Sequence, residues 1–257
     1  MIAFENITMR FGGVAAVDRC SFEIPTGKIT GLIGPNGAGK TTAFNVIAGH
    51  LRPTSGRVLL EGEDITALPA HKRQAMGIAR TFQLAHEFHR MTVVENLMVA
   101  AKNELGENML NAIFRPGQCK LQEQAAYDRA MATLRFLEIE QLKDQLAGDL
   151  SGGQKKLLEL GRALMQHPKI ILLDEIGAGV NRTLLGKIAE KIIQLNKEQG
   201  YTICLIEHDL DYVSRLCDTV IVMAQGTLLT TGTVEEISRD ERVIEAYFGG
   251  GKYQEAI

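Results

Sequence analysis

An eight-residue glycine-rich segment constrains the fold of this chain more than any other feature. Gly34–Thr41 reads G-P-N-G-A-G-K-T and matches the pattern G-x-x-x-x-G-K-[ST]. The apolar run Ile29–Ile33 precedes it, and Thr41–Ala48 carries apolar residues at helical spacing before Gly49. This order of strand, glycine loop and helix predicts a loop whose backbone N–H groups point at phosphates, with partial positive charge from the helix N-terminus.

The side chains at the end of this loop fit the same chemistry. Lys40 is expected to neutralise the β and γ phosphates of a nucleotide, and the Thr41 hydroxyl is expected to coordinate Mg²⁺ together with phosphate oxygens. The alternative is a glycine turn with an accidental lysine. The position between a strand and a helix argues against that alternative.

An acidic pair follows a second apolar run. Ile170–Leu173 leads directly into Asp174 and Glu175, at the carboxyl end of a predicted buried strand, where ligands bind in open α/β sheets. One carboxylate could hold Mg²⁺, and the other could polarise a water for in-line attack on the γ-phosphate. A solvated strand end would look the same in isolation, so the phosphate loop decides in favour of the functional interpretation.

A third glycine motif lies before a predicted helix. Leu150–Gln154 reads L-S-G-G-Q, and residues 155–165 form an apolar helical stripe. Ser151 near the helix start and two exposed glycine N–H groups make a second anion-binding geometry. The spacing alone favours the alternative, an ordinary serine-capped helix.

The remaining patterns predict an α/β fold. Ile2–Met9 and Cys20–Ile24 are expected to pair as antiparallel strands, and later strands alternate with helices as in a parallel sheet. Strand signals disappear over residues 92–165, which predicts a helical insert, with 103–121 as a loop or short helical excursion. Residues 249–257 are expected to form a flexible tail.

Composition excludes several classes of protein. The net charge of −3 over 257 residues gives no global attraction for nucleic acid. No stretch is long and apolar enough for a membrane span, and Glu5 interrupts the place of a signal peptide's apolar segment. The four cysteines lack metal-site or disulfide-scaffold spacing, which predicts free thiols in a reducing cytoplasm.

With these motifs in this order, the chain resembles the ATP-binding cassette (ABC) ATPases over nearly its whole length. Leu150–Gln154 reads letter for letter as the signature motif of that family, between the phosphate loop and the acidic pair. The resemblance implies a P-loop NTPase fold of the ABC type: a RecA-like parallel-sheet core and an antiparallel β subdomain in 1–91 and 166–248, with a helical subdomain in 92–165. It also implies ATP and Mg²⁺ as cofactors and a head-to-tail dimer.

The resemblance implies roles for single residues. Phe11 takes the position of the residue that stacks on adenine, although a strand core residue is the alternative. Gln83 matches the glutamine that senses Mg²⁺ and the attacking water and links to the membrane partner. His208 matches the histidine that contacts the γ-phosphate. Glu175, His208, Gln83 and Lys40 are then catalytic, and Thr41, Gln83 and Asp174 hold Mg²⁺. The expected ATP contacts are Phe11, Gly34, Pro35, Asn36, Gly37, Ala38, Gly39, Lys40, Thr41 and Thr42, with Ser151, Gly152, Gly153 and Gln154 contributed by the other subunit.

One position departs from the family pattern. Most members have a proline after the catalytic glutamate, where this chain has Ile176 followed by Gly177. The backbone stiffness of proline is therefore lost. Catalysis is expected to survive because Asp174 and Glu175 are intact, and the sequence leaves the turnover rate open. The loop Ala178–Asn181 resembles the segment that communicates across the dimer.

Softer signals resemble one branch of the family. Met9–Gly13, Ile78–Gln83, Thr92–Leu97 and Glu207–Asp209, with the long excursion to Leu121, resemble the larger ATPase subunit of branched-chain amino acid importers. This implies a peripheral protein at the cytoplasmic face of the membrane, with permease subunits, a second ATPase subunit and, indirectly, a periplasmic or extracellular substrate-binding protein as partners. Relatives that move short amides, urea or lipopolysaccharide share parts of these signals, so the sequence leaves the substrate open.

Three other functions compete with transport. A soluble ABC ATPase acting on DNA or ribosomes usually has a long coiled coil or two cassettes, and this chain has one phosphate loop and no sustained heptads or basic patch. An ATP-gated regulatory module would not need Glu175 and His208. A P-loop kinase would leave the signature motif unexplained.

Overall fold

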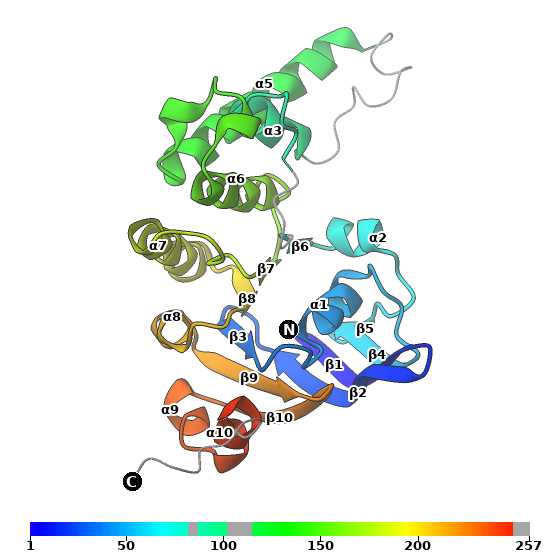
Figure 1. Ribbon diagram of the computed structural model, residues 1–257. Helices are drawn as coiled ribbons and strands as arrows, with labels where there is room; N and C mark the ends of the chain where they lie inside the picture. Colours follow the sequence, from blue (N-terminus) through cyan, green and yellow to red (C-terminus); the bar gives the residue numbers. More distant parts are fainter. Residues whose placement is uncertain (82–86, 102–114, 249–257) are drawn as a thin grey trace. The chain divides into compact units, whose positions relative to one another are not determined.

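The computed structural model describes residues 1–81, 87–101 and 115–248. The chain forms two compact units, which we call the core unit and the helical unit. The core unit comprises Met1–Arg80, Lys169–Ile176 and Ile192–Ile257, and the helical unit comprises Thr81–Pro168 and Gly177–Lys191. Figure 1 shows the chain traced through both.

The first sheet of the core unit is antiparallel. Its strand order is β2-β1-β4-β5, and Ile2 in β1 pairs with Ile24 in β2 and with Leu60 in β4. The strands are β1 (Ile2–Phe11), β2 (Val14–Ile24), β4 (Ser55–Leu60) and β5 (Glu63–Asp64). The predicted antiparallel pair at the start of the chain is therefore confirmed.

The second sheet of the core unit is mainly parallel. Its order is β10-β9-β3-β8-β7-β6, and only the β9–β10 pair is antiparallel. The strands are β3 (Ile29–Ile33), β6 (Ile78–Arg80), β7 (Ile170–Asp174), β8 (Thr202–Ile206), β9 (Thr219–Ala224) and β10 (Thr227–Gly232). Every residue of β3, β7 and β8 is buried, as the near-continuous apolar runs predict for central parallel strands.

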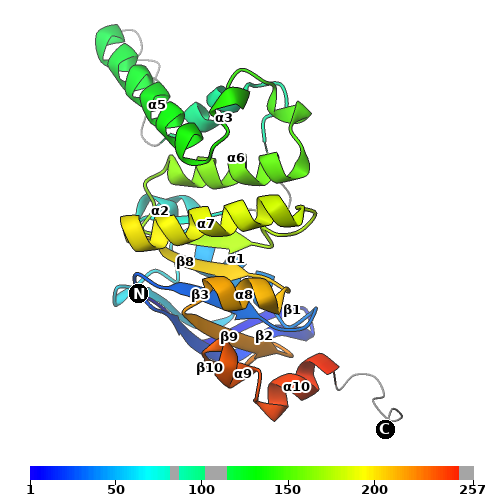
Figure 2. The same cartoon turned by 90° about the vertical axis from the view of Figure 1, so that its left-hand side faces the viewer.

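Helix α1 (Lys40–Ala48) contributes to one apolar core with both sheets. Phe44 and Ile47 are fully buried among residues of β1, β2, β4 and the parallel strands. The other core-unit helices are α2 (Ala70–Ala75), α8 (Leu210–Leu216), α9 (Val234–Ile237) and α10 (Glu241–Phe248), together with residues 192–199 of α7. Figure 2 shows α8 lying over β3, and Val213 of α8 packs beside Gly31. Helix α9 was not among the predicted elements, although Thr233 and Glu236 form a capping-box pattern.

The helical unit is built from α3 (Val93–Val99), α5 (Pro116–Phe136), α6 (Gly152–Leu164) and the first part of α7 (Arg182–Gln199), up to Lys191. Two short 3₁₀ turns, Glu140–Leu142 and Ala147–Asp149, join α5 to α6. Apolar Ala126, Ala130 and Leu134 form the buried face of α5.

The predicted helical insert, 92–165, lies within the helical unit, which also includes residues 81–91, 166–168 and 177–191. Within the segment 103–121, residues 116–121 form the start of α5, whose first residue is Pro116. Residues 103–114 lie outside the described residues. The predicted tail, 249–257, also lies outside them. Among the helices that the structure describes, none is long and apolar enough to cross a membrane.

Candidate active site

The carboxyl ends of three neighbouring strands form the candidate site. Strands β3, β8 and β7 lie side by side and parallel, so the residues that follow them meet at one edge of the sheet. A cavity of about 280 Å³ opens there. It is lined by Ala16, Asn36, Gly37, Ala38, Gly39, Lys40, Thr41, Thr42, Glu175 and His208.

The phosphate loop wraps around the side chain of Lys40. The Lys40 Nζ donates to the backbone oxygens of Gly34 at 2.7 Å and of Pro35 at 3.0 Å. The loop is also tied to the β9–β10 turn, because the Gly226 N–H donates to the Ala38 oxygen at 3.1 Å. Backbone contacts on both sides therefore fix the loop, so its N–H groups are preorganised for an anion.

The charge of Lys40 is balanced by the acidic pair. Burial lowers the pKa of the Lys40 amine, and the negative charges of Glu175 and Asp174 oppose that shift. The amine therefore belongs to the same electrostatic cluster as the two carboxylates.

Glu175 and His208 are brought together from different strands. The His208 Nε2 lies 3.0 Å from the Glu175 Oε1. Glu175 has a left-handed backbone conformation, φ 49°, and its N–H donates to the Ile206 oxygen at 3.0 Å. A non-glycine residue adopts this conformation at a cost of about 1 to 3 kcal/mol, and such residues cluster at functional sites. Local strain here directs a carboxylate towards the histidine and the cavity.

Asp174 is held by a residue that the sequence analysis gave no role. Its side chain is 1 % exposed, and its Oδ2 accepts a hydrogen bond from Arg80 Nη2 at 2.8 Å. Arg80 Nη1 also donates to Asn45 Oδ1 of α1 at 2.6 Å. The sequence feature that could have predicted this contact is an arginine at the end of the apolar strand Ile78–Arg80. A charged side chain at a buried strand end needs a partner.

Of two further predicted site residues, Phe11 and Gln83, the structure describes only Phe11. Phe11 ends β1 opposite Val14 and is 49 % exposed, so the alternative of a strand core residue is wrong. The described residues that line the cavity do not include it. Gln83 lies outside the described residues.

The motif Leu150–Gln154 forms the start of α6 in the helical unit. Ser151 is the N-cap: its hydroxyl accepts from the Gln154 N–H at 3.4 Å, and the Gln154 side chain accepts from the Ser151 N–H at 2.9 Å. The predicted helix cap is confirmed. Gly152 is exposed and Gly153 is buried.

Comparisons with known proteins identify the family. The family model "ABC transporter" matches residues 17–178, and the model "Branched-chain amino acid ATP-binding cassette transporter" matches residues 227–253. The high-affinity branched-chain amino acid transport ATP-binding protein BraF of Pseudomonas aeruginosa is 38 % identical over 97 % of this chain and 98 % of its own. The chain belongs to the ABC transporter family. A probable branched-chain amino acid transport ATP-binding protein, LivG of Methanocaldococcus jannaschii, is 41 % identical to this ABC ATPase over 95 % of the chain and 96 % of its own length.

Solved structures confirm the predicted fold of the ABC ATPase. A nucleotide-free ATP-binding cassette from an ABC transporter superposes with a TM-score of 0.85 at 38 % identity, covering 98 % of this chain and 99 % of the other. An ATP-binding cassette of an ABC transporter in its ADP conformation gives 0.81 at 37 % identity, covering 97 % and 98 %. These relatives support an ATP-hydrolysing transport subunit, and they do not support the alternative that acts on DNA or ribosomes.

The family departure after the acidic pair has a structural counterpart in this ABC ATPase. The Ile176 side chain is 2 % exposed and is buried in the core unit, whereas Gly177 begins a segment of the helical unit. Side-chain burial anchors the backbone on one side of this peptide bond, while Gly177 leaves the other side free of the restraint that a proline ring imposes. That catalysis survives this replacement stays a prediction.

The two glycines of the signature motif differ in the space around them. A Cβ on Gly153 would lie 2.1 Å from Leu184 Cδ2 and 3.4 Å from Val180 Cγ1, whereas the nearest atom to a Cβ on Gly152 is the Gly179 oxygen at 4.0 Å. Replacing glycine by alanine in a helix gains about 1 kcal/mol, and overpacking costs about 1 to 3 kcal/mol.

We therefore expect Gly152→Ala to leave the free energy of unfolding unchanged or raised, and Gly153→Ala to give a lower free energy of unfolding than Gly152→Ala, because the Leu184 side chain must turn aside. Leu184→Ala added to Gly153→Ala should recover stability, because it empties the space that the new methyl group needs. Urea denaturation of the four proteins measures these differences. Equal effects of the two glycine substitutions would contradict this packing argument.

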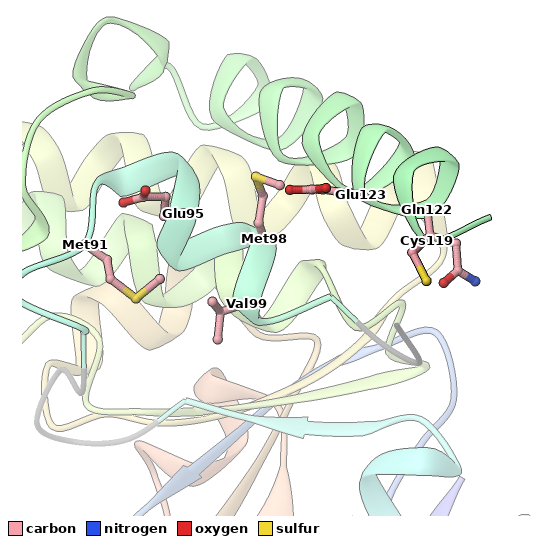
Figure 3. A pocket seen from close by; sticks show the side chains of 7 residues that line it. All are labelled: Met91, Glu95, Met98, Val99, Cys119, Gln122 and Glu123. Carbon is pink, nitrogen blue, oxygen red and sulfur yellow. The ribbon is translucent and has the colours of Figure 1, made fainter. Parts of the chain in front are cut away.

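A second cavity lies in the helical unit. Figure 3 shows it between α3, which contributes Glu95, Met98 and Val99, and α5, which contributes Cys119, Gln122 and Glu123. Its volume is about 280 Å³, and Met91 completes the lining. We call this cavity the α3–α5 groove. Its floor is apolar, and two carboxylates lie along it.

Proposed function

We propose that this chain is the ATP-hydrolysing nucleotide-binding subunit that powers a branched-chain amino acid importer. The relatives support the transport role, since BraF and LivG carry that description and match almost the whole chain. The single observation that carries the chemistry is the cavity that joins Lys40 and Thr41 to Glu175 and His208.

The phosphate loop binds the nucleotide in this proposal. Its N–H groups and Lys40 hold the β and γ phosphates, and Phe11 stacks on the adenine. The set Thr41, Asp174 and Gln83 would hold Mg²⁺. Oxygen donors of this kind suit Mg²⁺, which proteins bind through one or two carboxylates together with substrate phosphates. When bound, Mg²⁺ neutralises charge on the γ-phosphate oxygens.

Glu175 is the general base of the reaction. Its carboxylate orients a water, whose oxygen bonds to the γ-phosphorus while the bond to the β–γ bridging oxygen breaks. The proton of the water passes to Glu175, and ADP and phosphate are released. His208, 3.0 Å from Glu175, holds the carboxylate in place and contacts the γ-phosphate.

The signature motif acts on the ATP site of a second ATPase subunit. Ser151, Gly152, Gly153 and Gln154 would contact the γ-phosphate bound by the partner's loop, so two subunits enclose two nucleotides around a two-fold axis. ATP then drives closure of the dimer, which is a homodimer or, in the complete transporter, pairs this chain with a different ATPase subunit.

The membrane permease subunits are the partners of the α3–α5 groove. The apolar floor with Met91 and Met98 suits the packing of a short amphipathic helix, and Glu95 and Glu123 favour basic residues on it. The chain would thus lie at the cytoplasmic face of the membrane. The periplasmic or extracellular substrate-binding protein contacts the permease and not this chain.

Cysteine labelling tests the groove. We expect a maleimide at pH 7.5 to modify Cys119, because burial raises the pKa of Cys20 and of Cys217 to about 12, and raises that of Cys204 as well. Assembly with the permease should slow the modification of Cys119, as measured by mass spectrometry of peptides. Equal rates for the free and the assembled subunit would show that the permease binds elsewhere.

Purification of the tagged chain from gently solubilised native membranes tests the transport role. Mass spectrometry should find permease subunits and a second, shorter ATPase, whose associated binding protein identifies the substrate. Recovery of soluble proteins or nucleic acid alone would refute the transport role and leave the ATPase chemistry intact.

A further inference from the structure

Arg80 connects three elements around the acidic pair. It ends β6, and its side chain is only 7 % exposed. Its guanidinium donates to Asp174 of β7 at 2.8 Å and to Asn45 of α1 at 2.6 Å, and its central carbon lies 6.0 Å from the centre of the Phe44 ring. Asn45 lies on the helix that begins with Lys40. The guanidinium therefore joins the helix of the phosphate loop to the strand of the acidic pair.

We propose that Arg80 is a positioning residue of the ATPase site, which fixes the Asp174 carboxylate so that it meets the metal of a bound Mg·ATP without rearrangement. The inference deepens the proposed function and rests on it. The Asp174 side chain is 1 % exposed, and a buried carboxylate is costly unless a charged or hydrogen-bonding partner faces it. The guanidinium is planar and is anchored on Asn45 through Nη1, so its Nη2 presents a donor to Asp174 Oδ2 from a fixed direction.

The same contacts would also be present if Arg80 only stabilised the fold, so the experiment needs a matched control residue that stabilises the fold without contacting Asp174. Arg73 is such a control, because it is 1 % exposed, lies in the core unit and also braces α1. It donates to the backbone oxygens of Val46 and Ile47 at 2.6 and 2.9 Å, and to those of Leu68 and Thr66. Arg73→Lys thus removes a comparable buried guanidinium, whose hydrogen bonds within the described part of the chain all go to backbone oxygens.

The test measures nucleotide binding and hydrolysis against Mg²⁺ concentration. Arg80→Lys keeps the positive charge but cannot span Asp174 and Asn45 together. Mg²⁺ should increase the affinity for a fluorescent ATP analogue, and we expect the Mg²⁺ concentration that gives half of this increase to rise at least tenfold in Arg80→Lys. The Mg²⁺ concentration that gives half-maximal ATPase activity should rise by the same factor. Binding of the analogue in excess EDTA should stay unchanged, because the phosphate loop is intact. Arg73→Lys should lower the melting temperature and leave the Mg²⁺ dependence unchanged.

A second variant keeps the test decisive if Arg80→Lys fails to fold. Asn45→Ala removes one anchor of the guanidinium and keeps its pair with Asp174, so a smaller shift in the same direction is expected. An Mg²⁺ dependence equal to that of the wild type, or a shift no larger than that of Arg73→Lys, would overturn the positioning role. A wild-type protein that neither binds nor hydrolyses Mg·ATP would instead overturn the proposed function.

Discussion

Glu175→Gln should lower the rate of ATP hydrolysis by about 10² to 10⁴, the usual contribution of a general base. The amide is nearly the same size as the carboxylate and can still reach His208 Nε2, which lies 3.0 Å from Oε1. Binding by the phosphate loop is therefore preserved while the proton acceptor is lost. ATP-bound dimers should accumulate, visible by size-exclusion chromatography with light scattering in the presence of ATP.

Glu61→Gln is the matched control for this variant. Glu61 also has a left-handed backbone, φ 52°, but its exposed side chain pairs with Lys169 at 3.3 Å. The substitution removes one negative charge at a residue of the same backbone conformation, and Glu61 is not among the described residues that line the cavity, so hydrolysis should stay at the wild-type rate. Undiminished turnover in Glu175→Gln would show that another group activates the water.

Gly34→Ala should destroy the phosphate loop, whereas Gly37→Ala should only weaken it. A Cβ on Gly34 would lie 2.0 Å from the backbone oxygen of Met223 and 3.2 Å from the Ala38 Cβ, while a Cβ on Gly37 meets no atom within 4 Å. Both glycines have positive φ, 149° and 78°. The Gly37 substitution therefore carries only the left-handed penalty of about 1 to 2 kcal/mol.

For Gly34→Ala, the clash with a backbone atom cannot be relieved by a rotamer change. We expect a loss of more than about 4 kcal/mol in the free energy of unfolding, a large share of a typical total of about 5 to 15 kcal/mol. Urea denaturation measures stability, and titration with a fluorescent ATP analogue measures binding. Gly37→Ala should fold and bind with reduced affinity. Similar stability of the two variants would mean that the β9 strand end yields to the new methyl group.

Much of the candidate site could be predicted because its motifs are contiguous. The pattern Gly34–Thr41 identified a phosphate loop, and Ser151–Gln154 identified a capped helix, since loop conformation and helix capping depend on neighbouring residues. The same holds for the central strands. The apolar runs at β3, β7 and β8 predicted buried strands that the structure places side by side.

Other features depend on distant residues. The exposure of Phe11 follows from its place at the end of β1, and the partners of Arg80 are 35 and 94 residues away along the chain. Residues 103–121 were predicted as a loop or short helical excursion, and α5 begins within them at Pro116.

The amino-acid sequence of this ABC ATPase specifies its chemical groups and their local conformations: a phosphate loop, an acidic pair and a capped signature helix. Folding brings Lys40, Glu175 and His208 to one cavity and places Arg80 against Asp174. These neighbours follow from strand order and register, which depend on hydrogen bonds between segments far apart in the chain. The residues of a contiguous motif do not indicate which strand will pair beside it in the sheet.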